Sequence, residues 1–201
     1  MFLNLFKKIP IDFGQGNMRY ITKGKLIALD LIPKDGLGKK ALDVGCRSGY
    51  FSKILEEAGY EVTSIDIEKK YEKCQIVNVN NPMSYKNNYF DIIWCSEVIE
   101  HLDKPQETLI EFKRILNREG KVVLTTPNSQ FWVFRILKLF GLPPQKIQRK
   151  DHIHFFSIKD ILVLYPYKNN VYGFFPYFIL KFRIKKMINF LSPTFIFIVK
   201  K

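Results

Sequence analysis

Short apolar runs alternate along the chain with amphipathic stretches, and the two patterns predict strands and helices in turn. Buried strands are expected over residues 41–46, 61–67, 74–79, 90–96 and 121–127. Between them, residues 48–58 and 104–117 place apolar side chains at helical spacing, and residues 17–32 predict a further helix. Strands that are apolar on both faces and alternate with helices are typical of a parallel sheet covered on both sides.

Capping and stopping residues mark where several of these elements begin and end. Asp103 is placed to cap the helix over residues 104–117, with Pro105 in its first turn. Gly59 follows the helix over residues 48–58 and stops it. Because crossovers between parallel strands are right-handed, we expect a doubly wound α/β fold.

The pattern is looser after residue 127. Residues 131–140 are apolar nearly all round and predict a helix, whereas residues 141–156 predict a loop. Ser157 is a candidate cap for a short helix ending at residue 165. The β-rich runs at residues 171–182 and 194–199 would complete a mostly parallel, seven-stranded sheet, and the segment between them is open to either helix or loop.

Length and composition fit one domain. The 201 residues suffice for a full core, which we divide into an N-terminal helical segment (1–37), a cofactor-binding core (38–128) and a basic, aromatic segment (129–201). No stretch of the sequence reaches about 18 uncharged apolar residues, so we expect no membrane-spanning helix. The N-terminus lacks a signal-peptide pattern. Three cysteines without Cys-x-x-Cys spacing suit a reducing, cytoplasmic environment.

Positive charge is concentrated towards the C-terminus. The formal net charge is +13, and residues 131–201 alone carry thirteen basic and two acidic side chains. Residues 41–130 carry eleven basic and fourteen acidic side chains. A near-neutral core therefore has a basic segment attached to it, which either attracts nucleic acid, anionic lipid or a phosphorylated substrate or only keeps the surface solvated.

Glycines and polar residues follow four predicted strands, at the edge where open parallel sheets bind ligands. The first of these stretches has Gly45 and Gly49 in a Gly-x-x-x-Gly pattern, in place of the Gly-x-Gly-x-x-Gly of dinucleotide-binding folds. Asp43 just before it would repel a phosphate, so a cationic ligand suits the loop better. Asp66 ends the second strand, where a carboxylate can accept hydrogen bonds from two neighbouring ribose hydroxyls.

Four ordered segments together resemble the successive motifs of class I S-adenosylmethionine-dependent methyltransferases: LDVGCRSGYFS, SIDI, FDIIWCSEVIEHL and GKVVLTTPN. The similarity covers residues 38–128, and the phrase HIHFFS extends it to residue 157. The group it resembles includes ubiquinone and menaquinone methyltransferases and many that act on sugars. The resemblance implies a Rossmann-like methyltransferase fold and S-adenosylmethionine as the cofactor.

The resemblance also implies cofactor-binding residues, each from its place in a motif. The first loop would contact the methionine part of the cofactor, the second-strand acid the ribose, the residue after it the adenine, and a polar residue after the third strand the adenine amino group. The fourth-strand end would line the cofactor. These positions are Asp43, Gly45, Cys46 and Gly49; Asp66; Ile67; Asn78 or Asn80; and Ser96 with Glu97.

Two features depart from the family pattern. Arg47 replaces a common glycine, and the segment between Asp66 and Cys74 is short. Arg47 would be a harmless surface cation if it points outward, which we expect. If it points inward, it would place like charge near the sulfonium and weaken cofactor binding.

Methyl transfer from a sulfonium needs a base only when the acceptor must lose a proton. His101 is the first candidate because it follows the fourth strand, and His152 and His154 come next, in a loop expected to cross the top of the sheet. Each of the three could instead be structural. No metal is expected, because the His and Asp residues lack ligand spacing along the sequence.

The expected function is therefore S-adenosylmethionine-dependent methylation, at oxygen, of a small or carrier-linked acceptor of the glycan or quinone type. An RNA-directed methyltransferase and a non-catalytic scaffold on a decayed methyltransferase core are the alternatives. Residues 131–144 suit an acceptor-side or interfacial role. The protein would then be cytoplasmic and peripheral at the inner membrane surface, with nucleic acid the less favoured partner.

Overall fold

The structure, a computed structural model, describes residues 22–148, 151–164, 170–175 and 183–201. Its strands are β1 (Lys40–Val44), β2 (Glu61–Asp66), β3 (Cys74–Ile76), β4 (Phe90–Ser96), β5 (Leu116–Pro127), β6 (Val171–Phe174), β7 (Arg183–Ile184) and β8 (Thr194–Lys200). Its helices are α2 (Lys23–Leu29), α3 (Tyr50–Glu57), α4 (Pro105–Ile115), α5 (Trp132–Leu139), α6 (Pro144–Ile147), α7 (Ile158–Leu164) and α8 (Ile188–Leu191), with a 3-10 turn, η1, over Ile99–His101.

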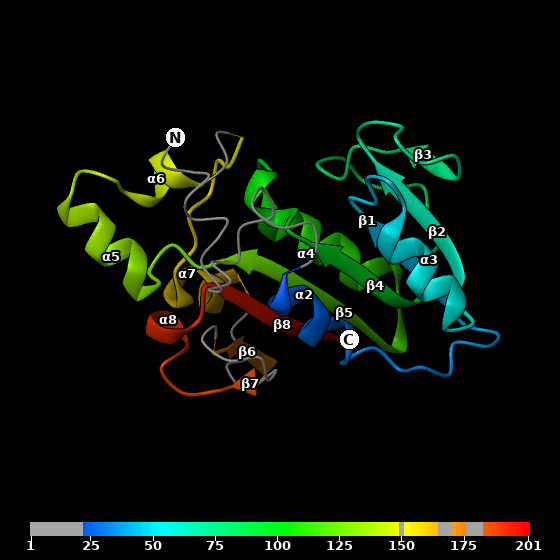
Figure 1. Cartoon of the computed structure of the whole chain (residues 1–201). Coiled ribbons are helices and arrows are strands. Elements are labelled where there is room, and N and C mark those ends of the chain that lie inside the picture. The colour runs from blue at the N-terminus through cyan, green and yellow to red at the C-terminus, as the bar shows by residue number, and fades with distance from the viewer. Residues whose placement is uncertain (1–21, 149–150, 165–169, 176–182) are drawn as a thin grey trace.

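The strands form one sheet in the order β3-β2-β1-β4-β5-β8-β6-β7 (Figure 1). Strands β1 to β5 pair in parallel, whereas β8 runs antiparallel to β5 and β6, and β7 antiparallel to β6. The expected doubly wound, mostly parallel sheet is confirmed. It has eight strands in the described residues where seven were expected, because the two-residue β7 adds an edge.

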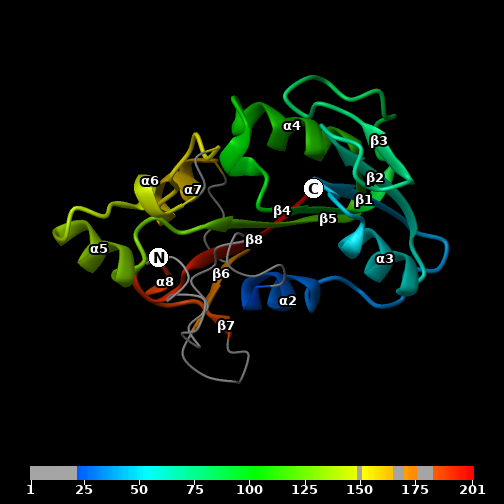
Figure 2. The same cartoon turned by 45° about the horizontal axis from the view of Figure 1, so that its top comes forward.

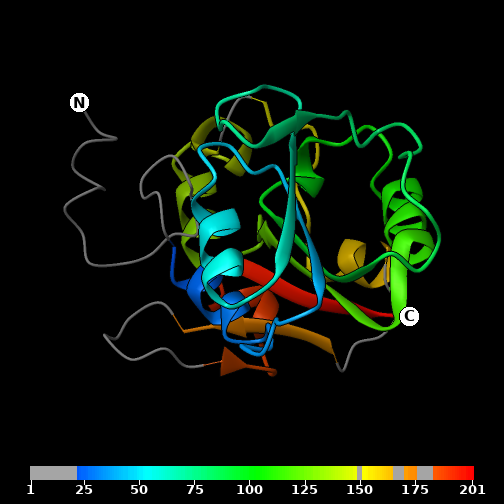
Figure 3. The ribbon, with the colours of Figure 1, turned by 90° about the vertical axis from the view of Figure 1, so that its right-hand side faces the viewer.

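Apolar side chains on both faces of the sheet explain why helices cover both. Along β1, Leu42 and Val44 pack into one buried cluster and Ala41 into another. The first cluster is closed by α4 and α7, and the second by α2 and α3. Figures 2 and 3 show these helices on opposite sides of the sheet. Burial on both faces is what the near-continuous apolar strands predict.

The helix α4 starts one residue later than expected and has a different cap. Its N-cap is Lys104, whose side chain makes no capping bond, and not Asp103. The residue before a proline is disfavoured in the helical region, so Lys104 ahead of Pro105 takes φ −133° and stays outside the helix. Asp103 instead donates its backbone N–H to the Asn80 side-chain oxygen at 3.0 Å.

Other boundaries shift in the looser regions. The strand expected over residues 74–79 is limited to β3, which pairs with only three residues of β2. The loop expected over residues 141–156 contains α6. The strand expected over residues 171–182 begins as β6, but residues 176–182 lie outside the described residues, as do residues 1–21 of the N-terminal segment.

Ser157 caps α7 as expected: its hydroxyl accepts the Asp160 N–H at 3.4 Å, and the Asp160 carboxylate accepts the Ser157 N–H at 2.7 Å. The segment that was open to helix or loop contains both β7 and α8. No helix of the described residues is both long and apolar enough to cross a membrane.

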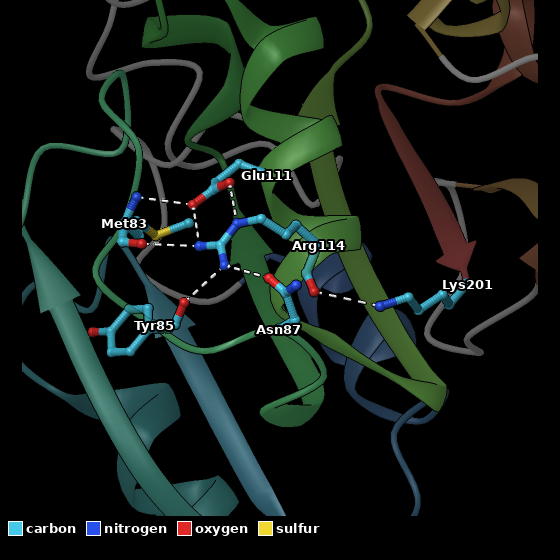
Figure 4. Close-up of polar contacts among 6 residues, drawn as sticks. All are labelled: Met83, Tyr85, Asn87, Glu111, Arg114 and Lys201. Carbon is cyan, nitrogen blue, oxygen red and sulfur yellow. Dashed lines mark hydrogen bonds and ion pairs between the residues drawn. The ribbon is translucent and has the colours of Figure 1, made fainter.

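Arg114 of α4 fixes the long loop between β3 and β4 (Figure 4). Its guanidinium donates to both carboxylate oxygens of Glu111 at 2.6 and 2.7 Å, to the carbonyls of Met83 and Tyr85 at 2.9 and 2.8 Å, and to the Asn87 side chain at 2.8 Å. Glu111 in turn accepts the Met83 N–H at 2.8 Å. A loop of polar residues is thereby tied to a helix, which gives its backbone the partners that a strand would otherwise supply.

Candidate functional site

A cleft of about 470 Å³ opens at the carboxyl ends of β1, β2 and β4. Its walls come from the loop after β1, the start of α3, the end of β2, the segment after β3 and the turn after β4. Most of the predicted cofactor-binding residues line it: Gly45, Cys46, Asp66, Ile67, Asn78, Asn80, Ser96 and Glu97. Residues between positions 45 and 97 of the sequence therefore meet in one cleft, as their places at the strand ends predict.

The loop after β1 needs glycine at two positions for steric reasons. Gly45 has φ +74°, and a Cβ there would lie 2.5 Å from a methyl group of Val98. Gly49 has φ +76° as the N-cap of α3, and a Cβ there would lie 2.5 Å from the Tyr71 ring. Gly49 is buried and is not among the residues that line the cleft. It turns the chain into α3 at the edge of the cleft, and its predicted contact with the cofactor stays a prediction.

Arg47, the residue that departs from the family, also lies in the left-handed region, at φ +48°. Its side chain is exposed, and it lines the rim of the cleft. A glycine takes this backbone conformation without strain, whereas an arginine does not. The left-handed backbone at this position therefore explains why a glycine is common here in the family that the sequence resembles, without any role in ligand binding.

Asp66 lies at the end of β2 with its carboxylate at the cleft wall. One of its oxygens accepts the Arg47 N–H at 2.9 Å, and the other accepts the N–H groups of Ile67 at 2.7 Å and Glu68 at 3.3 Å. These bonds fix the carboxylate and link the first loop to the second. A carboxylate has about four acceptor positions, so the oxygen that is bonded to Arg47 can also accept a hydrogen bond from a ligand in the cleft.

Asp43 does not line the cleft but lies beneath it. Only 1% of the residue is exposed, and its carboxylate accepts the Ser52 hydroxyl at 2.6 Å. Ser52 in turn accepts the Ser64 hydroxyl at 2.8 Å. Burial raises the pKa of Asp43 to about 6, with the Ser52 bonds opposing that rise. Asp43 therefore joins β1, β2 and α3 below the loop, and any effect on a ligand passes through its field.

The third wall of the cleft is the polar turn after β3. The Asn78 side chain accepts the Asn80 N–H at 3.0 Å, and the Asn80 side chain accepts the Asp103 N–H. Both oxygens thus hold the turn in place. Ile67, at the end of the neighbouring strand β2, is 67% exposed and presents an apolar surface at the cleft.

The end of β4 supplies a hydrogen-bonded acid. Glu97 has φ +57° and accepts the Thr125 hydroxyl at 3.1 Å, and Ser96 shares a 2.8 Å hydrogen bond with the same hydroxyl. A left-handed glutamate is an uncommon, strained conformation, and such positions gather at functional sites. Ser96 and Glu97 both line the cleft.

Of the three predicted histidines, only His101 lines the cleft. Its Nδ1 lies 2.9 Å from the Asp151 carbonyl oxygen. Because a carbonyl only accepts, Nδ1 carries the hydrogen, and Nε2 is the basic nitrogen of the neutral ring. His101 is therefore oriented by the segment that returns to the cleft at Asp151.

His152 and His154 lie behind or beside this site. The His152 ring is buried and meets the His101 ring edge to face, with centroids 4.7 Å apart. His154 has its Nε2 2.9 Å from the Leu102 carbonyl and stacks on Phe156. Neither ring reaches the cleft, so the structure leaves His101 as the histidine placed to contact a ligand.

Glu100 is buried beneath the histidines. Its carboxylate accepts the Thr126 hydroxyl at 3.0 Å, and its other oxygen lies 3.9 Å from His152 Nε2. Burial and the nearby Glu97 raise the pKa of Glu100 well above its usual value. Ligand atoms of Glu100, His101 and His152 all lie within 4.8 Å of one another. Spacing along the sequence did not predict this group, because the fold joins residues 51 positions apart, and the absence of a metal stays a prediction.

Lys25 is a cleft residue that sequence reasoning missed. It comes from α2, lines the cleft and is only 7% exposed, with its ammonium 5.7 Å from the centre of the Phe51 ring. Its charge favours the ionised forms of Asp43 and Glu100. The available signal was a lysine on the apolar face of an amphipathic helix, where a solvated side chain is not expected.

Comparison with known proteins assigns this chain to a family. Residues 17–165 match a protein family described as "Methyltransferase domain". The chain belongs to this methyltransferase domain family. The resemblance to class I S-adenosylmethionine-dependent methyltransferases is thereby confirmed, and S-adenosylmethionine is the cofactor of the family.

Solved structures agree with the fold of this methyltransferase domain. It aligns with an S-adenosylmethionine-dependent methyltransferase from Archaeoglobus fulgidus at a TM-score of 0.64 and 19% identity, covering 89% of this chain and 94% of that one. It also aligns with a complex of the Haloferax volcanii Trm112 activator and a methyltransferase, at a TM-score of 0.62 and 12% identity, covering 88% and 87%. At these identities the similarity establishes the fold alone.

Among curated relatives, the methyltransferase domain is similar to ubiquinone biosynthesis O-methyltransferases. It is 30% identical to that of Aromatoleum aromaticum over 55% of each chain. It is 32% identical to that of Coxiella burnetii, over 47% of this chain and 46% of the relative. The chain thus spans about half the length of the curated relatives it matches.

Proposed function

We propose that the protein transfers a methyl group from S-adenosylmethionine to an oxygen of a small or carrier-linked acceptor of the quinone type. The observation that carries the proposal is the cleft itself, which brings a fixed carboxylate, a buried cation and an oriented histidine to the strand ends. The curated relatives named for ubiquinone biosynthesis support a phenolic hydroxyl as the acceptor group.

The lining residues fit the parts of this cofactor. Asp66 would accept the ribose hydroxyls, since its fixed carboxylate retains acceptor capacity. Lys25, buried at the cleft, would pair with the carboxylate of the methionine part, because a buried cation is stabilised by an opposite charge. Ile67 would flank the adenine, with Asn78 or Asn80 at its amino group.

The remaining wall suits the positive charge of the cofactor. Gly45 and Cys46 would border the methionine part, and Glu97 would provide a negative charge nearby. Burial raises the pKa of the Cys46 thiol, so that residue stays neutral and offers surface rather than a nucleophile. The sulfonium supplies an already activated methyl group when the cofactor is bound.

His101 would act on the acceptor. Its Nε2 would take the proton from the acceptor hydroxyl, while its Nδ1 hydrogen remains bonded to the Asp151 carbonyl. Glu100 and His152 would hold the ring of His101 from behind. A proton acceptor at this place favours oxygen as the methylated atom, since a neutral hydroxyl attacks poorly until it loses its proton.

Methyl transfer from labelled S-adenosylmethionine to three pools of acceptors tests the proposal: catechols and other phenols, glycans, and RNA. We expect label in the phenol pool, and a rate that falls at least about 100-fold in His101→Asn, within the usual contribution of a general base. The control is His154→Asn, which removes a ring that does not reach the cleft.

The other outcomes separate the alternatives. Label in RNA alone would replace the proposal with an RNA-directed methyltransferase. Binding of the cofactor without transfer to any pool, or no binding, would favour a non-catalytic scaffold. An unchanged rate in His101→Asn would contradict the role of His101.

A further inference from the structure

An exposed apolar and cationic surface lies at one end of the molecule, away from the cores. Figures 1 and 2 show α5 projecting beyond the sheet, with α6 and α8 beside it. Four apolar side chains of this region are exposed: Ile136 (45%), Leu139 (84%), Phe140 (74%) and Leu142 (37%). Three exposed cations lie among them in the sequence: Arg135, Lys138 and Lys146. We call these seven residues the α5 surface.

The α5 surface is held in place by packing that excludes these side chains. Phe131 and Phe134 form a small buried cluster of their own, against which Trp132, Val133, Leu137 and Ile147 pack. The inner face of α5 is thus satisfied by protein, and its outer face keeps apolar groups in solvent. Leu139 and Phe140 are exposed and add no buried apolar area to the fold. Apolar side chains that stay in solvent together in this way indicate contact with another molecule.

The charges of this region select the kind of contact. Residues 131–148 contain no acidic side chain. Two copies of such a surface would repel each other, which disfavours self-association. The exposed apolar groups are mainly aliphatic, and single-stranded nucleic acid is held by stacking on aromatic rings. Aliphatic groups mixed with cations instead match a bilayer surface, where the former enter the acyl boundary and the latter meet anionic headgroups.

The place of the α5 surface relative to the cleft gives the contact a purpose. Strands β4 and β5 are parallel, so their carboxyl ends lie at the same edge of the sheet, where the cleft opens. Helix α5 follows β5 and therefore begins at that edge. The chain after α6 returns to the cleft wall at Asp151. A bilayer that contacts α5 would therefore lie on the acceptor side of the molecule.

A second element extends the same surface. The Arg135 guanidinium lies 5.7 Å from the centre of the Phe190 ring on α8. Phe190 is 41% exposed and Met187 is 65% exposed. Lys185 and Lys186 directly before them are also exposed. The mixture of apolar and cationic side chains therefore continues from α5 onto α8.

We propose that the α5 surface docks the protein on an anionic phospholipid bilayer, so that a lipid-linked acceptor reaches the cleft from the membrane. The purpose of the contact rests on the proposed function, but the docking itself requires neither the cofactor nor the acceptor. Docking of this kind is reversible and weakens as salt screens the headgroups.

The test is co-sedimentation of the full chain with vesicles of phosphatidylcholine, with and without phosphatidylglycerol, at low and high salt. We expect binding to the phosphatidylglycerol vesicles at low salt and at least about tenfold weaker binding for the double variant Leu139→Glu/Phe140→Glu, which loses apolar area and adds two negative charges. The matched control is Leu37→Glu, since Leu37 is 90% exposed in the loop before β1. That variant should bind as the wild type does.

Three results would overturn the proposal: no binding of the wild type to phosphatidylglycerol vesicles at low salt, equal binding to vesicles without phosphatidylglycerol, or unchanged binding of the double variant. A change in oligomeric state in the double variant without a change in vesicle binding would make the surface an interface between copies. Loss of RNA binding in place of vesicle binding would make it a nucleic-acid surface.

Failure of the docking proposal can be told apart from failure of the proposed function. Transfer to a water-soluble phenol should be the same in the double variant as in the wild type, because Leu139 and Phe140 lie outside the cleft. If no variant transfers methyl groups but vesicle binding follows the pattern above, the function is wrong and the docking stands. Thermal denaturation of the double variant checks that it is folded.

Discussion

Arg47 strains the backbone of the first loop, and its main-chain N–H also helps to hold the cleft residue Asp66. Its backbone is left-handed, at φ +48°, while its N–H fixes the Asp66 carboxylate. A non-glycine residue in that conformation destabilises the fold by about 1–2 kcal/mol. A glycine removes this strain, but it also gives the unfolded chain more conformational entropy, which cancels part of the gain. The hydrogen bond to Asp66 comes from the main chain, so any residue except proline can make it.

We predict that Arg47→Gly raises stability by about 0.5–1 kcal/mol, because the strain is removed and the Asp66 bond is kept. The midpoint of thermal denaturation should rise by roughly 2–4 °C. The control is Lys53→Gly, the same kind of exchange inside α3, which should lower stability by about 1 kcal/mol. A lower midpoint for Arg47→Gly would contradict the assignment of strain to this residue.

Asp43 leads to a pH prediction. Its pKa is 3.8 in an ordinary environment and about 6 in the fold, so the folded protein binds the proton more tightly than the unfolded chain. The contribution of Asp43 to the free energy of unfolding is therefore highest below about pH 4, falls between pH 4 and 6, and stays low above that range.

Asp43→Asn removes this titration, so its stability relative to the wild type should rise by about 1–3 kcal/mol between pH 4 and pH 7, since the pKa shift of about two units corresponds to 1.36 kcal/mol per unit. Thermal denaturation at both pH values measures it. Asp35→Asn is the control, because Lys39 lowers the pKa of that exposed carboxyl and its trend has the opposite sign. A difference between Asp43→Asn and the wild type that does not change with pH would rule out this burial effect.

Among elements, the loop between β3 and β4 depends most on one side chain. Arg114 donates to two backbone carbonyls and one side chain of that loop, and to Glu111 beneath it. The loop carries Asn78 and Asn80 into the cleft wall. Its order is thus set from α4, away from the ligand.

Arg114→Ala should lower stability by about 2–3 kcal/mol, the range for hydrogen bonds to a charged group, and lower the thermal midpoint by roughly 5–10 °C. Cofactor affinity should fall with it, since the cleft wall that contains Asn78 and Asn80 loses its support. Arg118→Ala removes an exposed arginine from β5 and should change stability by no more than about 0.5 kcal/mol. Equal effects of the two exchanges would remove Arg114 from this role.

The sequence predicted the elements where two signals agreed and failed where only one was present. Strands β1, β4 and β8 combine apolar runs with turn residues shortly before them, and all three lie within two residues of where they were expected. The start of α4 was misplaced because an acid that favours capping was read without the constraint that Pro105 places on the residue before it. The limits of β3 depend on its neighbour, and a strand pattern alone does not contain that information.

The site was predictable as a set of strand ends but not in its depth. Asp66, Ser96 and His101 reach the cleft, because position along a parallel strand determines which edge a residue occupies. Asp43 and Gly49 lie beneath it, since direction relative to the sheet depends on packing. Lys25 had only the weak signal of a lysine on an apolar helix face, and the contact of His101 with His152 joins distant segments and has no local signal.

At the scale of the whole molecule, the charge asymmetry of the sequence corresponds to a division of tasks. The near-neutral residues 41–130 form most of the cleft, and the basic segment after residue 130 includes the projecting α5. Cofactor binding and docking would thus use separate surfaces of one fold, and each can be removed without the other.

The central claim is that the cleft binds S-adenosylmethionine through Asp66, and isothermal titration of the purified protein with this cofactor tests it most directly. We expect saturable binding to the wild type, unchanged binding to Glu61→Ala at the opposite end of β2, and at least about 100-fold weaker binding to Asp66→Ala, because two hydrogen bonds to a charged acceptor are lost. Circular dichroism confirms that each variant is folded. A wild type that does not bind the cofactor, or a folded Asp66→Ala that binds it as tightly as the wild type, would contradict the account.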